Sequence, residues 1–261
     1  MSMRYAENGV AKMGTWPGRY LSDSVAELVL GKTGGFLSEV GFCVPEGGAL
    51  DRLDAAGFAV DKETQMVRAG PDLVWEAMRT LPRRMLLYDR AGKRPATFYE
   101  KPSFMGAGTP VNVHDLDTGR RRPATWRDVQ NFVRLQDALP QVDIVRPTVT
   151  ATDLGQGSDL IEIAELLRGT GKPIVHRTLS PDRVDAAFEM LATVAGGEDA
   201  FRARPNFAVV YCPISPGYFT PENVRCMLAW AEHGVPITLL SMAMGGASAP
   251  ATLLGELIVI N

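Results

Sequence analysis

The sequence predicts an α/β protein whose second part alternates strands with helices. Runs of β-branched and apolar residues indicate strands, and Ser or Thr placed before Pro or an acidic residue indicates helix starts. Strand starts recur roughly every thirty residues, which is the size of one strand–helix–strand unit. Such units form a parallel sheet with helices outside. A TIM-type (β/α) barrel and a doubly wound sheet both fit this pattern, so it predicts either architecture.

The first part, residues 1–100, is expected to be an α-rich segment with minor strands. Leu30–Gly34 superficially resembles a phosphate-binding loop, but the residues before it look helical. We interpret it as a helix end capped by glycines. In order, we expect a helix from Ser22, a segment over 36–44, a helix after Pro45, a strand over 57–61, a helix from Pro71 and a strand over 85–89.

The second part, residues 101–261, is more regular. Thr125 and Asp128 match a capping box, in which the two side chains satisfy the exposed amides of a helix start. Strands are expected over 142–150, 172–176, 206–212 and 236–240. Helices are expected after Thr125, over 158–167, after Ser180, after Thr220 and over 251–260, and a hairpin turn over 113–119.

Composition excludes several classes of protein. With 27 basic and 30 acidic residues the net charge is −3, which does not indicate a nucleic-acid partner. We expect no membrane span and no signal peptide, because long apolar runs are absent. The three cysteines form no CxxC pair, and the three histidines lack metal-ligand spacing, so we expect a cytoplasmic protein without a metal. Gly106–Pro110 lacks the third glycine of a dinucleotide fingerprint, so no nicotinamide cofactor is expected.

In both candidate folds the reactive groups lie past the carboxyl ends of the strands. The most informative turn is Tyr211–Phe219, where two prolines and a glycine fix a sharp bend that carries aromatics, a thiol and a hydroxyl. Ser241–Pro250 ends the next strand in small residues flanked by methionines, which would let a bulky ligand approach the backbone. A structural loop and a tightly packed strand–helix junction are the alternatives. His176 ends a predicted central strand and is a candidate catalytic residue.

Several ordered segments carry a resemblance to a known family. They are Glu39–Phe42, Asp117–Arg121, Pro123–Thr125, Asp137–Pro140 with Val142–Asp143, Thr170–Pro173, Pro213–Pro216 and Met242–Pro250. Together they resemble the trimethylamine methyltransferase family, which includes glycine betaine methyltransferases and other relatives that lack pyrrolysine. The family differs at three positions, where Asn, Leu and Pro are usual in place of Cys212, Gly217 and Ser241.

The resemblance implies a TIM barrel after an α-rich segment, and methyl transfer from a methylated amine to the Co(I) corrinoid (cobalamin) of a partner protein. A quaternary ammonium suits aromatic faces, for which the candidates are Phe104, Tyr211, Tyr218 and Phe219. Arg146 or Arg177 could pair with a betaine carboxylate, and His176 could act on a tertiary amine. The remaining candidates are Cys212 and Ser215 toward the substrate, and Met242, Met244, Gly245 and Gly246 toward the corrinoid.

Family members continue for nearly as much chain again, and only about five of the eight strands of a barrel are found here. We therefore expect an incomplete barrel, either a fragment or a short form completed by a partner or by a second copy in a homo-oligomer. Two other readings stay open: another TIM-barrel transferase of unrelated small molecules, and a catalytically silent fragment or binding module.

Overall fold

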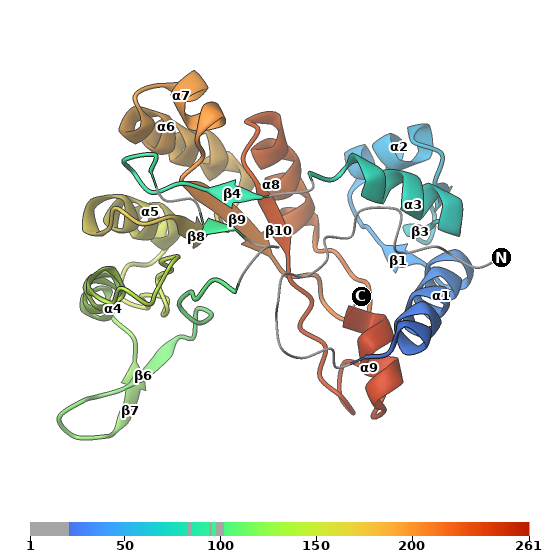
Figure 1. Ribbon diagram of the computed structural model, residues 1–261, viewed down its shortest axis with the longest axis horizontal. Helices are drawn as coiled ribbons and strands as arrows, with labels where there is room; N and C mark the ends of the chain where they lie inside the picture. The colour runs from blue at the N-terminus through green and yellow to red at the C-terminus, as the bar shows by residue number, and fades with distance from the viewer. Residues whose placement is uncertain (1–20, 83–84, 94–95, 98–101, 261) are drawn as a thin grey trace. The chain divides into compact units, whose positions relative to one another are not determined.

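The computed structural model describes residues 21–82, 85–93, 96, 97 and 102–260. Helices and small sheets alternate along this chain, which confirms the predicted mixed α/β class (Figure 1). The chain divides into two compact units. One holds the described residues within 1–83 together with 211–227 and 239–261; the other holds those within 84–210 together with 228–238. The predicted division near residue 100 stays a prediction.

The first unit begins with helix α1, whose start and end both have a local cause. Ser22 Oγ accepts the Val25 amide at the N-terminus, as its sequence predicts. The helix continues past Gly31 and Gly34 to Glu39, so the expected helix end at these glycines is wrong. The glycine that follows the helix is Gly41, whose φ of +81° is in the left-handed region.

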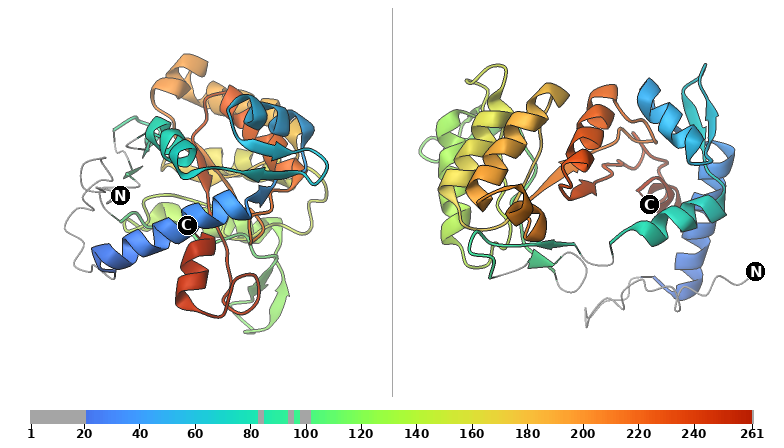
Figure 2. Two further views of the ribbon diagram at one scale, coloured as in Figure 1. Left: turned by 90° about the vertical axis from the view of Figure 1, so that its right-hand side faces the viewer. Right: turned by 90° about the horizontal axis from the view of Figure 1, so that it is seen from above.

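Short elements complete the α-rich segment of this unit. Strands β1, β3 and β2 pair antiparallel in that order. Helix α9 packs against α1, and Figure 2 shows the two helices side by side. The elements are α1 (Asp23–Glu39), β1 (Phe42–Cys43), α2 (Gly47–Ala55), β2 (Ala59–Asp61), β3 (Met66–Arg68), α3 (Pro71–Thr80) and α9 (Leu253–Ile260).

A parallel sheet organises the second part of the chain. Its strand order is β10-β9-β8, and β8 pairs parallel with β9. Isolated parallel bridges extend it, from Ile174 to Val145 and from Ile144 to Met105. The elements are β8 (Ile174–His176), β9 (Phe207–Tyr211), β10 (Ile237–Leu239), α4 (Trp126–Ala138), α5 (Ser158–Gly169), η1 (Pro181–Arg183), α6 (Val184–Ala195), α7 (Glu198–Ala203) and α8 (Pro221–Glu232). Within the described residues the sheet is not closed, and the barrel stays a prediction.

The strand predicted over 142–150 is shorter than expected. Only Ile144 and Val145 bridge to neighbouring segments. Pro147 has no amide to donate to a ladder, and Thr148 has a φ of +66°, which is unfavourable for a β-branched residue. The extended segment therefore ends before Thr148, and the prediction was wrong beyond that point.

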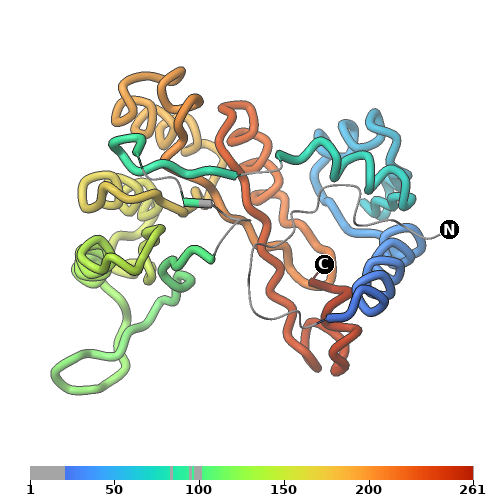
Figure 3. The backbone as a smooth tube through the Cα atoms, in the orientation of Figure 1, coloured from blue at the N-terminus to red at the C-terminus, as the bar shows by residue number. Residues whose placement is uncertain are grey.

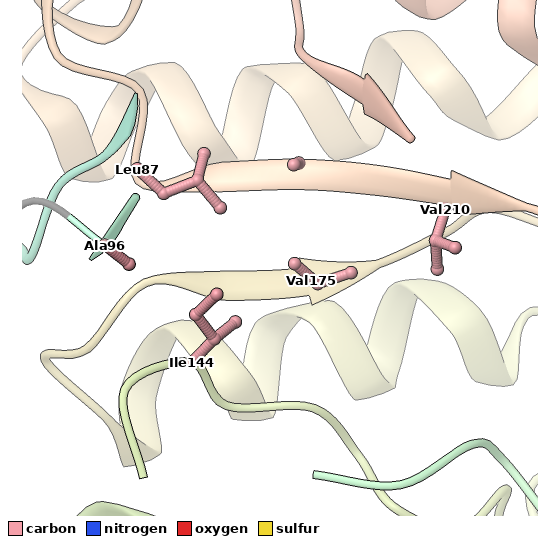
Figure 4. Close-up of a cluster of buried hydrophobic side chains, with 6 residues drawn as sticks. Leu87, Ala96, Ile144, Val175 and Val210 are labelled. Atoms are coloured by element: carbon pink, nitrogen blue, oxygen red, sulfur yellow. The ribbon is translucent and has the colours of Figure 1, made fainter. Parts of the chain in front are cut away.

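A hairpin lies at the amino ends of the parallel strands. Strands β4 (Leu86–Leu87) and β5 (Ala96–Thr97) pair antiparallel. The Tyr88 amide donates to the Pro205 carbonyl just before β9. Leu87 and Ala96 pack into a buried cluster with side chains of the parallel strands, as Figure 4 shows. Because this end of the sheet is filled by apolar side chains, ligand chemistry is expected at the opposite, carboxyl ends.

A second hairpin, β6 (Asn112–His114) with β7 (Arg121–Pro123), precedes α4 and confirms the turn expected over 113–119. Figure 3 traces it as a projecting loop. Arg122 bridges Asp128 at 2.7 Å and Asp115 at 3.1 Å, and hydrogen bonds from its guanidinium lower the pKa of both carboxyls. Asp128 also forms the predicted capping box with Thr125, so one carboxylate links the hairpin to the start of α4.

Candidate active site

The turn after β9 closes on itself and is held by strand β1, all within the first unit. Ile214 and Tyr218 exchange two backbone hydrogen bonds of 2.8 Å around the turn. The Cys43 amide donates to the Gly217 carbonyl at 2.8 Å, and the Phe219 amide donates to the Cys43 carbonyl at 3.0 Å. The turn is therefore clamped along its backbone by a strand that precedes it by more than 160 residues in the chain.

Aromatic side chains gather at this clamped turn. The rings of Phe42 and Phe219 meet edge to face with centroids 5.8 Å apart. Tyr218 is 37% exposed and so could meet a ligand, whereas Tyr211 on β9 is only 1% exposed. Phe42 was not among the residues predicted for the site, because it lies on the short strand β1 far away in sequence. Its ring adds to the aromatic surface that could face a cation.

The turn after β10 has the same closed form, but its backbone hydrogen bonds lie mainly among its own residues. The Met244 carbonyl accepts the amides of Ala247, Ser248 and Ala249 at 2.9–3.1 Å, and Gly246 donates to the Ala249 carbonyl at 2.9 Å. The side chains of Met242 and Met244 are 64% and 62% exposed. Gly245 and Gly246, which follow Met244 in the chain, are also exposed. Without side chains, they leave their backbone open to a large ligand.

The two turns meet at a pair of serine hydroxyls. Ser215 Oγ lies 3.4 Å from Ser241 Oγ, and Ser241 Oγ lies 3.5 Å from the Val259 carbonyl oxygen of α9. Cys212 is half-buried, and its carbonyl accepts the side-chain amide of Asn223 at 3.3 Å. The turn residues Cys212, Ser215, Tyr218, Phe219, Met242, Met244, Gly245 and Gly246 thus all belong to one unit. Their binding roles stay predictions.

In the other unit, His176 ends β8 as predicted and is buried. Its Nε2 lies 3.0 Å from Glu162 Oε2 of α5, and the two side chains are 5% and 2% exposed. The two atoms do not meet the geometry of a hydrogen bond, so the ring nitrogen lies buried against the carboxylate without a well-aligned bond to it. The second carboxylate oxygen, Glu162 Oε1, accepts the Ala151 amide at 3.1 Å.

Asp159 performs a similar task one helical turn earlier. It accepts the Leu179 amide at 2.7 Å and pairs with Arg183 at 2.8 Å. Both carboxylates therefore hold loops that follow strands. The sequence carried a signal for this, because Asp159, Glu162, Ile163 and Leu166 follow the i, i+3, i+4, i+7 spacing of a buried helix face. Acidic residues on such a face require partners.

Arg146 is 8% exposed, and both polar groups of its backbone are hydrogen-bonded to one side chain. Gln136 of α4 donates to the Arg146 carbonyl at 2.7 Å and accepts its amide at 3.2 Å. A methyl group on Gly106 would lie 2.2 Å from Gln136 Oε1 and 2.6 Å from Thr148 Oγ1. Gly106 is thus required by packing, which explains the glycine of the incomplete dinucleotide fingerprint.

The remaining predicted residues also lie in this unit. The Phe104 ring is 67% exposed, while its amide donates to Asp143 Oδ2 at 2.9 Å. Arg177 is half-buried directly after His176. The predicted residues therefore divide between the two units, with His176, Arg146, Arg177 and Phe104 in one and the two turns in the other. No group of three metal-ligating side chains occurs in the described ranges.

Comparison with known proteins decides the family. A family model described as trimethylamine methyltransferase (MTTB) matches residues 13–261, nearly the whole chain. The chain belongs to the trimethylamine methyltransferase family. The family assignment made from the sequence motifs is thereby confirmed.

Two similar proteins carry the name of this family. Trimethylamine methyltransferase MttB of Desulfitobacterium hafniense (strain DSM 10664 / DCB-2) is 32% identical over 215 residues, which cover 82% of this chain and 43% of the relative. MttB of Methanosarcina barkeri (strain Fusaro / DSM 804) is 29% identical over 213 residues, covering 78% and 43%.

A third relative is named for a different amine. Glycine betaine methyltransferase of Desulfitobacterium hafniense (strain Y51) is 25% identical over 158 residues, covering 60% of this chain and 33% of the relative. The chain thus spans less than half the length of these curated relatives. No helix in the described ranges is both long and apolar enough to cross a membrane.

Proposed function

We propose that this chain contributes to methyl transfer from a methylated amine, such as trimethylamine or glycine betaine, to the Co(I) corrinoid of a partner protein. Family membership supports a methyltransferase, and the relatives named above differ in the amine that their names give, trimethylamine for two of them and glycine betaine for the third. The observation that carries the proposal is the meeting of the two turns at Ser215 and Ser241, 3.4 Å apart. It joins an aromatic surface to an exposed methionine–glycine surface in one unit.

The aromatic turn is suited to a methylammonium group. Tyr218 and the edge-to-face pair of Phe42 and Phe219 offer ring faces on a backbone fixed by β1. Ring quadrupoles attract a cation that water holds only weakly. A rigid backbone reduces the entropy lost when a ligand binds. We therefore assign the recognition of the cation to this turn.

The second turn fits a large flat ligand such as a corrinoid. Exposed thioether side chains at Met242 and Met244 provide a polarizable apolar surface, and Gly245 and Gly246 offer no side chain to obstruct it. When bound, a Co(I) corrinoid supplies the nucleophile that accepts the methyl group. The protein's task is to hold the amine in line and to exclude water. A quaternary amine leaves as a neutral amine, so no acid is required from the chain.

The proposal is tested by incubating the chain with free cobalamin, reduced to Co(I) by titanium(III) citrate, and with trimethylamine or glycine betaine. Proton NMR should detect the demethylated amine, and its rate should fall at least about tenfold in Tyr218→Leu, the loss expected for a desolvated cation–π contact. Tyr218→Phe, which keeps the ring, should retain most of the rate. Binding of the amines without any turnover would favour the silent binding module.

A separate arm examines the predicted carboxylate partner. Replacing Arg177 by Gln should weaken binding of glycine betaine, because a charge-assisted pair with its carboxylate is lost. Trimethylamine has no carboxylate, so its affinity should be unchanged. An equal loss for the two amines would remove this role from Arg177.

A further inference from the structure

The hairpin tip, residues 115–121 between β6 and β7, is ordered although it faces solvent. Leu116 in this tip is 100% exposed. Thr118 donates its amide and its hydroxyl to Asp115 Oδ1 at 3.1 and 3.0 Å, and the Gly119 amide donates to the Asp115 carbonyl at 2.8 Å. Arg122 pairs with the other oxygen of the same carboxylate. Because these bonds already fix the turn, placing Leu116 against another surface costs little conformational entropy.

The hairpin tip also carries more positive than negative free charge. Arg120 and Arg121 are exposed, and neither forms an ion pair within the described ranges. They outweigh Asp117, the carboxylate of the tip that Arg122 does not pair. An exposed leucine is ordinary by itself, and it gains meaning only beside a complementary surface.

A complementary hollow lies in the same unit, where α6 meets the start of α7 and the end of α8. Its volume is about 330 Å³, and Phe188 and Ala192 contribute apolar lining. The Phe188 ring stacks on His233 with centroids 4.1 Å apart. Three carboxylates also line the hollow, those of Asp185, Glu189 and Glu198. This volume is at the small end of ligand pockets, so the hollow suits one side chain better than a whole ligand.

One of these carboxylates is free to meet a cation. Arg202 pairs with Glu198 at 2.8 Å, and His233 Nε2 lies 2.8 Å from Asp185 Oδ1. Glu189 is exposed and, within the part of the chain that the structure describes, forms no ion pair. The hollow therefore offers an apolar floor beside an unneutralised negative charge, the counterpart of an apolar side chain beside free arginines.

We propose that the hairpin tip of one copy of this chain docks in the hollow of a second copy, with Leu116 in the hollow and the two arginines facing Glu189. The second copy is the occupant because the positive tip and the negative hollow belong to one chain. They do not meet within a copy, since α4 and α5 lie between the hairpin and α6 (Figures 1 and 2). A contact between two different surfaces is head to tail, so repeating it closes a ring or extends a row of copies. This inference does not depend on the proposed methyl transfer.

Sedimentation velocity over a range of concentrations measures the association. Wild type should form dimers or larger species, and Leu116→Ser should raise the dissociation constant at least about tenfold, the value of one buried leucine. Glu189→Arg should weaken association as well, because it places like charges together. Both side chains are exposed, so both variants should fold, which circular dichroism checks. Leu135→Ser is the matched control: this leucine is 53% exposed on α4, outside the tip and the hollow, and its loss should leave association unchanged.

Mixing the two variants tests the pairing of the two surfaces directly. The Leu116→Ser copy keeps its hollow and the Glu189→Arg copy keeps its tip, so an equal mixture retains one intact contact. It should form dimers that neither variant forms alone, whereas a contact between identical surfaces would not be restored. The proposal is overturned by a wild type that stays monomeric up to about 0.1 mM, where micromolar contacts are largely formed. Variants that associate like wild type, or a mixture that stays monomeric, would overturn it equally.

Discussion

The turns after β9 and β10 have the same closed form but different support. In the first, Ile214 and Tyr218 close the turn and β1 adds two further backbone hydrogen bonds through Cys43. In the second, Met244 and Ala249 close the turn, and the backbone hydrogen bonds that residues 244–249 make in the described structure all stay within that segment. One turn therefore depends on a distant strand, whereas the other depends on its own residues.

This difference separates two requirements of the proposed site. A cation needs ring faces held in one place, because each rotamer that must be ordered on binding costs affinity. A large flat ligand instead needs open backbone and adaptable side chains, which exposed methionines and glycines provide. The N-terminal segment, which the sequence separates from the turns, thus contributes directly to the more rigid of them.

The largest effect is expected from distorting the backbone at the start of β1, the strand that holds the first turn. Gly41 has a φ of +81°, and a Cβ there would lie 2.1 Å from the Val67 carbonyl oxygen. Gly41→Ala should lower the free energy of unfolding by about 3 kcal/mol, from left-handed strain together with overpacking against backbone. Chemical denaturation measures the loss. Hydrogen exchange should show lost protection at the Cys43 and Phe219 amides but unchanged protection at Ala247 and Ala249. Equal loss at both turns would contradict independent support.

A matched pair of glycine substitutions sharpens the comparison. Gly217 and Gly246 both have positive φ, +62° and +80°. A Cβ on Gly217 would lie 3.3 Å from Phe42 Cβ, whereas one on Gly246 would lie at an ordinary 3.7 Å from Ala251 Cβ. Gly217→Ala should therefore destabilise by about 2 kcal/mol and Gly246→Ala by about 1 kcal/mol.

The readout that separates the pair is local. Amide exchange at Cys43 should increase in Gly217→Ala, because the added methyl group pushes the turn away from β1. The same amide should be unaffected in Gly246→Ala. Similar exchange at Cys43 in both variants would show that φ alone, and not the contact with Phe42, decides the cost.

Local signals in the sequence predicted the elements well. The capping box at Thr125 and the helix cap at Ser22 are present, and the strands ending at His176 and Tyr211 lie where apolar β-branched runs placed them. These features depend on neighbours within a few residues. The strand over 142–150 failed because Thr148 adopts a left-handed φ that is rare for a β-branched residue, and residue preferences do not anticipate it.

Contacts between distant segments could not be predicted in the same way. No spacing in the sequence pairs Cys43 with Gly217, or brings Gln136 against Gly106. The burial of Tyr211 was also hidden, because all five residues of β9 are buried and the strand lacks an alternating pattern. Glu162 is different, because the sequence spacing places it on the buried face of a helix. An acidic residue on such a face requires a partner, and this could be predicted.

The smallest effect is expected where the two turns touch. Ser241 Oγ lies 3.4 Å from Ser215 Oγ and 3.5 Å from the Val259 carbonyl oxygen, so both contacts are long. Ser241→Ala should change the free energy of unfolding by no more than about 0.5 kcal/mol, since long hydrogen bonds between partly exposed groups contribute little. Ser215→Ala is the matched control and should cost no more than Ser241→Ala, and the double variant should be no worse than Ser241→Ala alone, because Ser215→Ala removes only the contact between the two hydroxyls, which Ser241→Ala removes as well. Additive losses in a double-mutant cycle would show that the hydroxyls act on separate partners and that the turns are joined by other contacts.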